Sequence, residues 1–135
     1  MRHILVVDSD PRICQAIYKM LSAMPYTVSF AFDAIAAVSE ARKHNPDLMI
    51  VDLSLPAGSG LTVVERLRAI PAFAAMPIIV IAERGARLEA AKVLDAGANA
   101  FLPKPLNSHL LLHYVGRLLP SRERIWWEDA QPVAK

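Results

Sequence analysis

Short apolar runs alternate with segments of helical periodicity along this chain. The runs are typical of strands and cover residues 4–7, 26–31, 48–52, 78–82 and 100–102. Between them, apolar residues recur every three or four positions, which predicts amphipathic helices over residues 12–24, 34–44, 61–70, 87–96 and 108–119. Strict alternation of five strands with five helices predicts right-handed crossovers and an α/β fold, a doubly wound parallel sheet with helices on both faces.

Turn residues and helix caps divide these segments. Asp33 is placed to cap the second helix, and Asn107 or Ser108 the last one. Gly97 follows the fourth helix, where a left-handed residue commonly ends a helix. Prolines after the first, third and fifth helical segments end those helices. The pattern predicts one domain over residues 1–120, and it leaves residues 121–135 as a tail or the start of a linker.

Composition narrows the class of protein. The 135 residues are 54% hydrophobic and 21% charged, which is typical of a globular domain, and no stretch is apolar for long enough to span a membrane. The net charge is only +2 and the basic residues are scattered, so we expect no nucleic-acid surface and no membrane contact. The apolar run at residues 4–7 is too short for a signal peptide, because Asp8 interrupts it. Cys14 is the only cysteine, so we expect a cytoplasmic protein.

Charged side chains follow three of the predicted strands. Asp8 and Asp10 come after the first strand, Asp52 ends the third, and Lys104 follows the fifth. Because the carboxyl ends of parallel strands share one edge of the sheet, these groups should meet there. Clustered carboxylates need a divalent cation or raised pKa values to coexist, and an added lysine suits the charge of a phosphoryl group in transfer. The pattern predicts a phosphoryl acceptor.

Simpler interpretations exist for each residue taken alone. Asp8 and Asp10 suit the capping of a helix, and Asp52 suits a nucleophile, a metal ligand or a cap. Lys104 alone would be a solvated surface lysine. Cys14 lies among apolar neighbours, which favours a buried and inert thiol.

Several segments together resemble the receiver domains of two-component response regulators, the CheY-like family. They are Val-Val-Asp ending at Asp8, the run Pro-Asp-Leu-Met-Ile-Val-Asp-Leu-Ser-Leu-Pro-Ala-Gly-Ser-Gly at 46–60, Asp-Ala-Gly-Ala-Asn-Ala-Phe at 95–101, and Lys104-Pro105. No single segment would be sufficient, but their combination is specific, and the resemblance covers residues 3–119.

The resemblance implies a flavodoxin-like fold with strand order 2-1-3-4-5. It implies that a histidine kinase or phosphotransfer protein phosphorylates Asp52, and that Lys104 contacts the phosphoryl oxygens. Mg²⁺ would be bound by Asp8, Asp52 and the backbone carbonyl of Ser54. The Lys104–Pro105 peptide bond would be cis. Homodimers would form through the helix at 87–96, the strand at 100–102 and the last helix.

Two departures from this family concern the metal and the switch. The second acid after the first strand is replaced by Ser9, a weaker ligand for Mg²⁺, and Asp10 would reach the site only if the loop were shifted. We therefore expect weakened metal binding. In this family a Thr or Ser after the fourth strand hydrogen-bonds the phosphoryl group and moves inward on activation; here that position is Ala82, which has no donor. The aromatic residue that takes part in the same switch is Phe101, which lacks the hydroxyl of a tyrosine. We therefore expect phosphorylation to change the conformation weakly, or through residues other than these two.

Neighbouring residues add a charge and surplus apolar surface. Glu83 brings negative charge toward a site meant for phosphate, with Arg84 beside it as partial compensation. In the last helix a core stripe of apolar residues includes Leu110, while Leu112 and Leu119 fall beyond it and suggest a partner face. The tail carries Trp126 and Trp127, whose role the pattern leaves open.

Three functions from different classes are compatible with this pattern. The first is a signalling receiver that accepts a phosphoryl group on Asp52. The second is a pseudo-receiver, a phosphorylation-independent interaction module, which Ser9 and Ala82 favour and which Asp52 and Lys104 oppose. The third, an enzyme, is a phosphatase of the haloacid dehalogenase type, because Asp8-Ser9-Asp10 resembles its Asp-x-Asp motif; the later motifs of that class are missing, so we expect no enzyme beyond self-phosphorylation.

Overall fold

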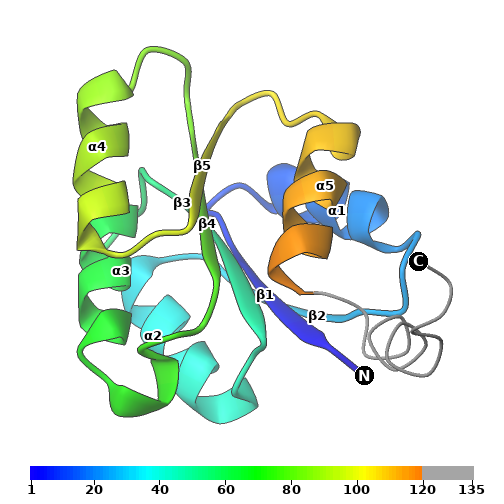
Figure 1. The fold of residues 1–135 in the computed structure, drawn as a ribbon, viewed down its shortest axis with the longest axis horizontal. Coiled ribbons are helices and arrows are strands. Elements are labelled where there is room, and N and C mark those ends of the chain that lie inside the picture. The colour runs from blue at the N-terminus through cyan, green and yellow to red at the C-terminus, as the bar shows by residue number, and fades with distance from the viewer. Residues whose placement is uncertain (120–135) are drawn as a thin grey trace, which may run out of the picture.

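The computed structural model describes residues 1–119 and forms a five-stranded parallel sheet between two layers of helices (Figure 1). The strand order is β2-β1-β3-β4-β5, which confirms the expected topology. The strands are β1 (His3–Val7), β2 (Thr27–Ala31), β3 (Leu48–Asp52), β4 (Ile78–Ala82) and β5 (Ala100–Pro103). The tail, including the Trp126–Trp127 pair and the predicted boundary at Pro120, lies outside the described residues.

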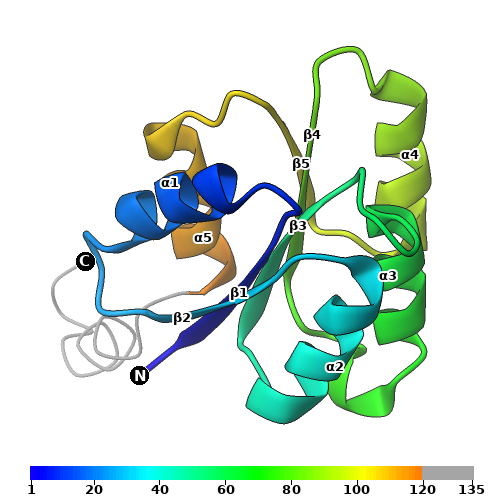
Figure 2. The ribbon, with the colours of Figure 1, turned by 180° about the vertical axis from the view of Figure 1, so that it is seen from behind.

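Helices cover both faces of the sheet, as the alternation predicts. They are α1 (Pro11–Leu21), α2 (Ala34–His44), α3 (Gly60–Arg68), α4 (Arg87–Ala96) and α5 (Ser108–Leu118), with a short 3-10 helix η1 (Pro71–Phe73). Figures 1 and 2 show α1 and α5 on one face and α2, α3 and α4 on the other. The sheet therefore divides the interior into two apolar cores.

The three central strands are buried on both faces. In β1, Ile4 and Val6 enter the core beneath α1 and α5, while Leu5 and Val7 enter the other core. All five residues of β3 are buried, including the terminal Asp52. An uninterrupted apolar run is what such a strand requires, because its alternate side chains meet two different cores.

Several boundaries differ from the sequence prediction. Helix α1 ends at Leu21 and not at Met24, because Ser22 closes it: the Ser22 hydroxyl donates to Lys19 O over 2.7 Å. Met24 precedes a proline, which disfavours the helical conformation, and it is 45% exposed. Helix α3 ends at Arg68, two residues before Ile70, and the sequence analysis did not predict η1.

The predicted caps are confirmed. Asp33 caps α2 by accepting a hydrogen bond from Ala36 N over 2.7 Å, and Asn107 is the residue that caps α5. Gly97 ends α4 with a φ of 119°, in the left-handed region where a side chain would be strained. The Lys104–Pro105 peptide bond is cis, as expected.

The last helix turns Leu111 and Val115 into the core as expected, but the assignment of individual leucines near its ends differs. Leu119, assigned outside the core stripe, is only 6% exposed and belongs to the core beside α1. Leu112 is half-buried against the same core, whereas Leu110, assigned to the stripe, is 40% exposed. The apolar run 110–112 offers no polar position to show which of its leucines face the core. Leu119 is therefore not an exposed contact residue, whereas a partner face that includes the half-buried Leu112 stays a prediction.

No helix within residues 1–119 is both long enough and apolar enough to cross a membrane. Cys14 is buried in the core under α1, as predicted. Burial and the nearby Asp8 charge raise the pKa of the Cys14 thiol to about 11, so the reactive thiolate is scarce at neutral pH.

Candidate functional site

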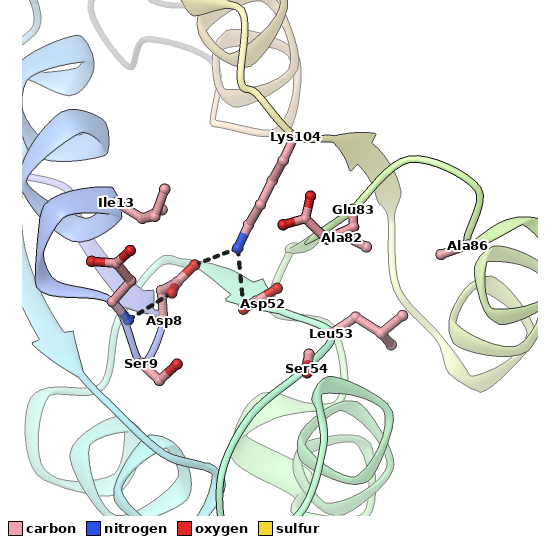
Figure 3. Close-up of a pocket in the computed structure, with 11 residues that line it drawn as sticks. Asp8, Ser9, Ile13, Asp52, Leu53, Ser54, Ala82, Glu83, Ala86 and Lys104 are labelled. Carbon is pink, nitrogen blue, oxygen red and sulfur yellow. Dashed lines mark hydrogen bonds and ion pairs between the residues drawn. The ribbon is translucent and has the colours of Figure 1, made fainter.

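The carboxyl ends of the strands enclose a pocket of about 370 Å³ (Figure 3). The loops after β1, β3, β4 and β5 each contribute to its wall. The lining residues are Asp8, Ser9, Asp10, Ile13, Asp52, Leu53, Ser54, Ala82, Glu83, Ala86 and Lys104. The structure thus brings the predicted charged residues into one crevice.

Asp52 is the last residue of β3, and this position places it in the pocket. Immediately after it, Leu53 N donates to Ile81 O over 2.8 Å, and Gly60 N donates to Leu53 O over 2.7 Å, which fixes the turn on both sides. Asp52 as a whole residue is 5% exposed. Burial and the Asp8 charge raise the pKa of Asp52, while Lys104 acts in the opposite direction.

Lys104 reaches across the pocket from the end of β5 and bridges two acids. Its Nζ lies 3.1 Å from Asp8 Oδ2 and 3.2 Å from Asp52 Oδ2 (Figure 3). Burial by itself would lower the pKa of Lys104, but the two carboxylates outweigh it and raise the pKa. The lysine therefore stays protonated and supplies a positive charge between the two acids.

Asp8 is almost completely buried, at 1% exposed. Its Oδ1 accepts a hydrogen bond from Asp10 N over 2.9 Å, which shapes the turn after β1. Its Oδ2 is ion-paired with Lys104 but makes no well-aligned hydrogen bond within the described residues. A buried carboxylate oxygen in this state can accept a further ligand from the pocket.

Asp10 and Ser9 occupy different positions in the same loop. Asp10 caps α1: its Oδ1 accepts from Arg12 N over 2.9 Å, and its Oδ2 lies 3.1 Å from the Arg12 guanidinium. These hydrogen bonds from Arg12 lower the pKa of Asp10. Ser9 is exposed and lines the pocket. Asp10 also borders the pocket, but its carboxylate is engaged with α1 and Arg12.

The two switch positions lie apart. Ala82 is 3% exposed and lines the pocket, so no hydroxyl projects from this wall. Phe101 is half-buried, packs against the core beneath α2 to α4, and does not line the pocket. Sequence reasoning missed three apolar wall residues, Ile13, Leu53 and Ala86; their spacing matches that of ordinary core positions, so no sequence signal separated them.

The donors in this pocket suit a hard cation. Within the described residues no group of three or more His, Cys, Asp or Glu side chains is placed to hold a metal ion. Mg²⁺ nevertheless needs only one or two protein carboxylates, since water and phosphate oxygens complete its octahedron. Asp8, with its incompletely bonded Oδ2, and Asp52 meet that requirement.

The raised pKa of Asp52 predicts that its charge costs stability in the absence of a cation. A raised folded-state pKa means that the folded chain holds a proton that the unfolded chain has already released. Stability therefore falls as pH rises from the unfolded value through the folded one. Asp52→Asn should raise the melting temperature by several degrees at pH 7, and this gain should vanish below about pH 4.

Melting curves measured from pH 4 to pH 8 without divalent cations test this prediction. Glu89→Gln, an exposed acid on α4, is the matched control and should shift the melting temperature little at any pH. An Asp52→Asn variant that melts below wild type at pH 7 would contradict the prediction.

Comparison with known proteins identifies the family to which this fold and site correspond. Residues 4–116 match the family model described as the response regulator receiver domain. Among curated proteins, the chain is 34% identical over 125 residues to the DNA-binding dual master transcriptional regulator RpaA of Synechocystis, covering 93% of this chain and 52% of that protein. It is also 34% identical over 131 residues to response regulator MprA of Mycobacterium avium, covering 97% and 56%.

Solved structures agree. A putative response regulator from Chloroflexus aurantiacus superposes with a TM-score of 0.84 at 28% identity, covering 89% of this chain and 98% of that one. The chemotaxis response regulator CheY4 of Vibrio cholerae gives 0.82 at 28% identity, covering 88% and 99%. The chain spans about half the length of its curated relatives, whereas these two solved chains are covered almost entirely. This chain belongs to the receiver domain family of two-component response regulators.

Proposed function

We propose that Asp52 accepts a phosphoryl group from a phosphohistidine of a histidine kinase or phosphotransfer protein. The observation that carries this proposal is the buried Asp52 carboxylate, which faces the pocket 3.2 Å from the Lys104 ammonium. Family membership supports the proposal, because receivers act with histidine kinases. The expected location is the cytoplasm.

In the proposed transfer an Asp52 oxygen attacks phosphorus, and the bond from phosphorus to the donor nitrogen breaks. Lys104 can follow the incoming oxygens, because its Nζ already lies between Asp52 and Asp8. Asp8 and Asp52 would hold Mg²⁺ together with the Ser54 carbonyl, and the ion would neutralise charge that develops on the phosphoryl oxygens. With Ser9 in place of a second acid, we propose that this binding is weak.

The phosphoryl group would have few means of changing the surface. Ala82 offers no hydroxyl to bond it, and Phe101 is already packed against the core. We propose that any signal leaves through α4, β5 and α5, where Leu88 and Leu110 are exposed, and that this face contacts a partner or a second copy. Trp126 and Trp127 receive no role, since they lie outside the described residues.

A small phosphodonor tests the acceptor. Incubation with acetyl phosphate and Mg²⁺ should add the mass of one phosphoryl group to the intact protein, and Asp52→Asn should abolish the addition. Chelation of Mg²⁺ should slow the addition strongly, because a divalent cation offsets the charge of donor and acids. Glu89→Gln should load as wild type does. If wild type gained no mass at any Mg²⁺ concentration, the phosphorylation-independent module would stand in place of this function.

A further inference from the structure

Glu83 contributes a carboxylate to the pocket that the proposed transfer does not use. It directly follows the buried Ala82 at the exit of β4 and lines the pocket. Figure 3 shows its carboxylate directed toward the tip of Lys104 from the side of the pocket formed by Ala82 and Ala86.

This carboxylate differs from the other acids that line the pocket. Asp8 and Asp52 are paired with Lys104, and Asp10 is paired with Arg12. Within the described residues Glu83 makes no hydrogen bond and no ion pair, although it faces the same crevice. Both of its oxygens are therefore available to accept hydrogen bonds from water in the pocket.

The position of Glu83 relative to Asp52 suits the hydrolysis of an aspartyl phosphate. Attacking and leaving oxygens lie roughly in line through phosphorus, so water must approach from the side opposite to Asp52. In Figure 3 the Asp52 carboxylate lies below the Lys104 ammonium and the Glu83 carboxylate lies above and to the right of it, so the two acids face the ammonium from different directions. Ala82 places only a methyl group on the wall from which Glu83 projects, and so leaves room for a water molecule.

We propose that Glu83 orients the water that hydrolyses the phosphoryl group on Asp52, and so limits the lifetime of the phosphorylated state. The water oxygen forms a bond to phosphorus while the bond from phosphorus to Asp52 breaks, and the electron pair of that bond returns to the Asp52 carboxylate. Glu83 accepts a hydrogen bond from the water, takes the proton that it loses, and releases the proton to solvent. The products are inorganic phosphate and the original Asp52. This inference rests on the proposed acceptor role of Asp52.

The test separates loading from loss. Wild type, Glu83→Gln and Glu83→Ala are phosphorylated with acetyl phosphate, the donor is removed, and intact mass is followed with time. A positioned general base typically raises the rate of a reaction about 10²-fold or more. In a loose phosphoryl-transfer transition state the water has lost little of its proton, so we expect a smaller effect: the half-life of the phosphorylated protein should lengthen about tenfold in both variants. Glu89→Gln removes an exposed acid that does not line the pocket, and its half-life should match wild type.

The loading rate distinguishes water positioning from charge repulsion. Orientation of water predicts a loading rate within about twofold of wild type in Glu83→Gln, because donor and acceptor are unchanged. If the loading rate of Glu83→Gln rose by the same factor as its half-life, the proposal would be overturned, because the Glu83 charge would then act by repelling the phosphoryl group and not by positioning water. An unchanged half-life on a protein that loads normally overturns this inference alone. Absence of loading in every variant overturns the acceptor role of Asp52, and this inference with it.

Discussion

Gly60→Ala should destabilise the domain by about 3 kcal/mol and distort the acceptor site, although it adds only one methyl group. A Cβ at Gly60 would lie 2.5 Å from Asp52 O and 2.7 Å from Leu53 Cα. Both contacts are with backbone atoms of the turn that presents Asp52, so no flexible side chain can move aside. The start of α3 must move away from the end of β3, which would break the 2.7 Å hydrogen bond from Gly60 N to Leu53 O.

Thermal melting checks this prediction, with a fall of about 10 °C expected. Gly116→Ala is the matched control, because a Cβ there meets nothing within 4 Å and the residue lies inside α5. Alanine is the better helix former by about 0.5–1 kcal/mol, so this second variant should melt above wild type. If the two variants melted alike, the close approach of Gly60 to β3 would not be a source of the destabilisation.

The fold was largely predictable because its strands and helices are separated by clear signals. Unbroken apolar runs such as Ile78–Ala82 suit a strand between two cores, and prolines and caps bound the helices. Contacts between segments that are distant in the sequence follow no such local signal. Arg68 looks like an ordinary exposed residue at the end of a helix, yet its guanidinium donates to Gly97 O and Phe73 O and fixes the end of α4.

The candidate site was predictable to the extent that strand exits determine it. Asp8, Asp52 and Lys104 follow β1, β3 and β5, and parallel topology brings them together without further information. The orientation of the Asp10 side chain was not predictable, because its carboxylate could either point into the pocket or cap α1. In the structure it is bonded to Arg12, two residues away.

Lys104→Met should destabilise the domain by about 3–5 kcal/mol at neutral pH, the usual cost of removing one partner from a buried ion pair. The lysine side chain is 15% exposed, and those of Asp8 and Asp52 are 1% and 7% exposed. Its removal leaves two neighbouring buried carboxylates with no cation between them. Methionine approximates the length of the lysine stem, so the variant tests the charge more than the packing.

The pH dependence of Lys104→Met separates this electrostatic cause from a packing defect. Without the ammonium, the pKa of Asp52 should rise further above its usual range, because burial and Asp8 are then opposed only by the backbone hydrogen bond from Ser54. The folded variant would take up a proton at a higher pH than the unfolded chain does, so its deficit relative to wild type should shrink on acidification. A packing defect would leave the deficit constant with pH.

The double variant Asp52→Asn, Lys104→Met completes the test. Of the two acids that Lys104 bridged, it leaves only Asp8 charged, so the repulsion between them is gone and the melting temperature at pH 7 should lie above that of Lys104→Met alone. Added Mg²⁺ should recover part of the lost stability in Lys104→Met, because Asp8 and Asp52 remain to bind it, but should have little effect on the double variant. Equal melting temperatures for the single and double variants, with no response to Mg²⁺, would show that Lys104 stabilises the domain through its stem and not through its charge.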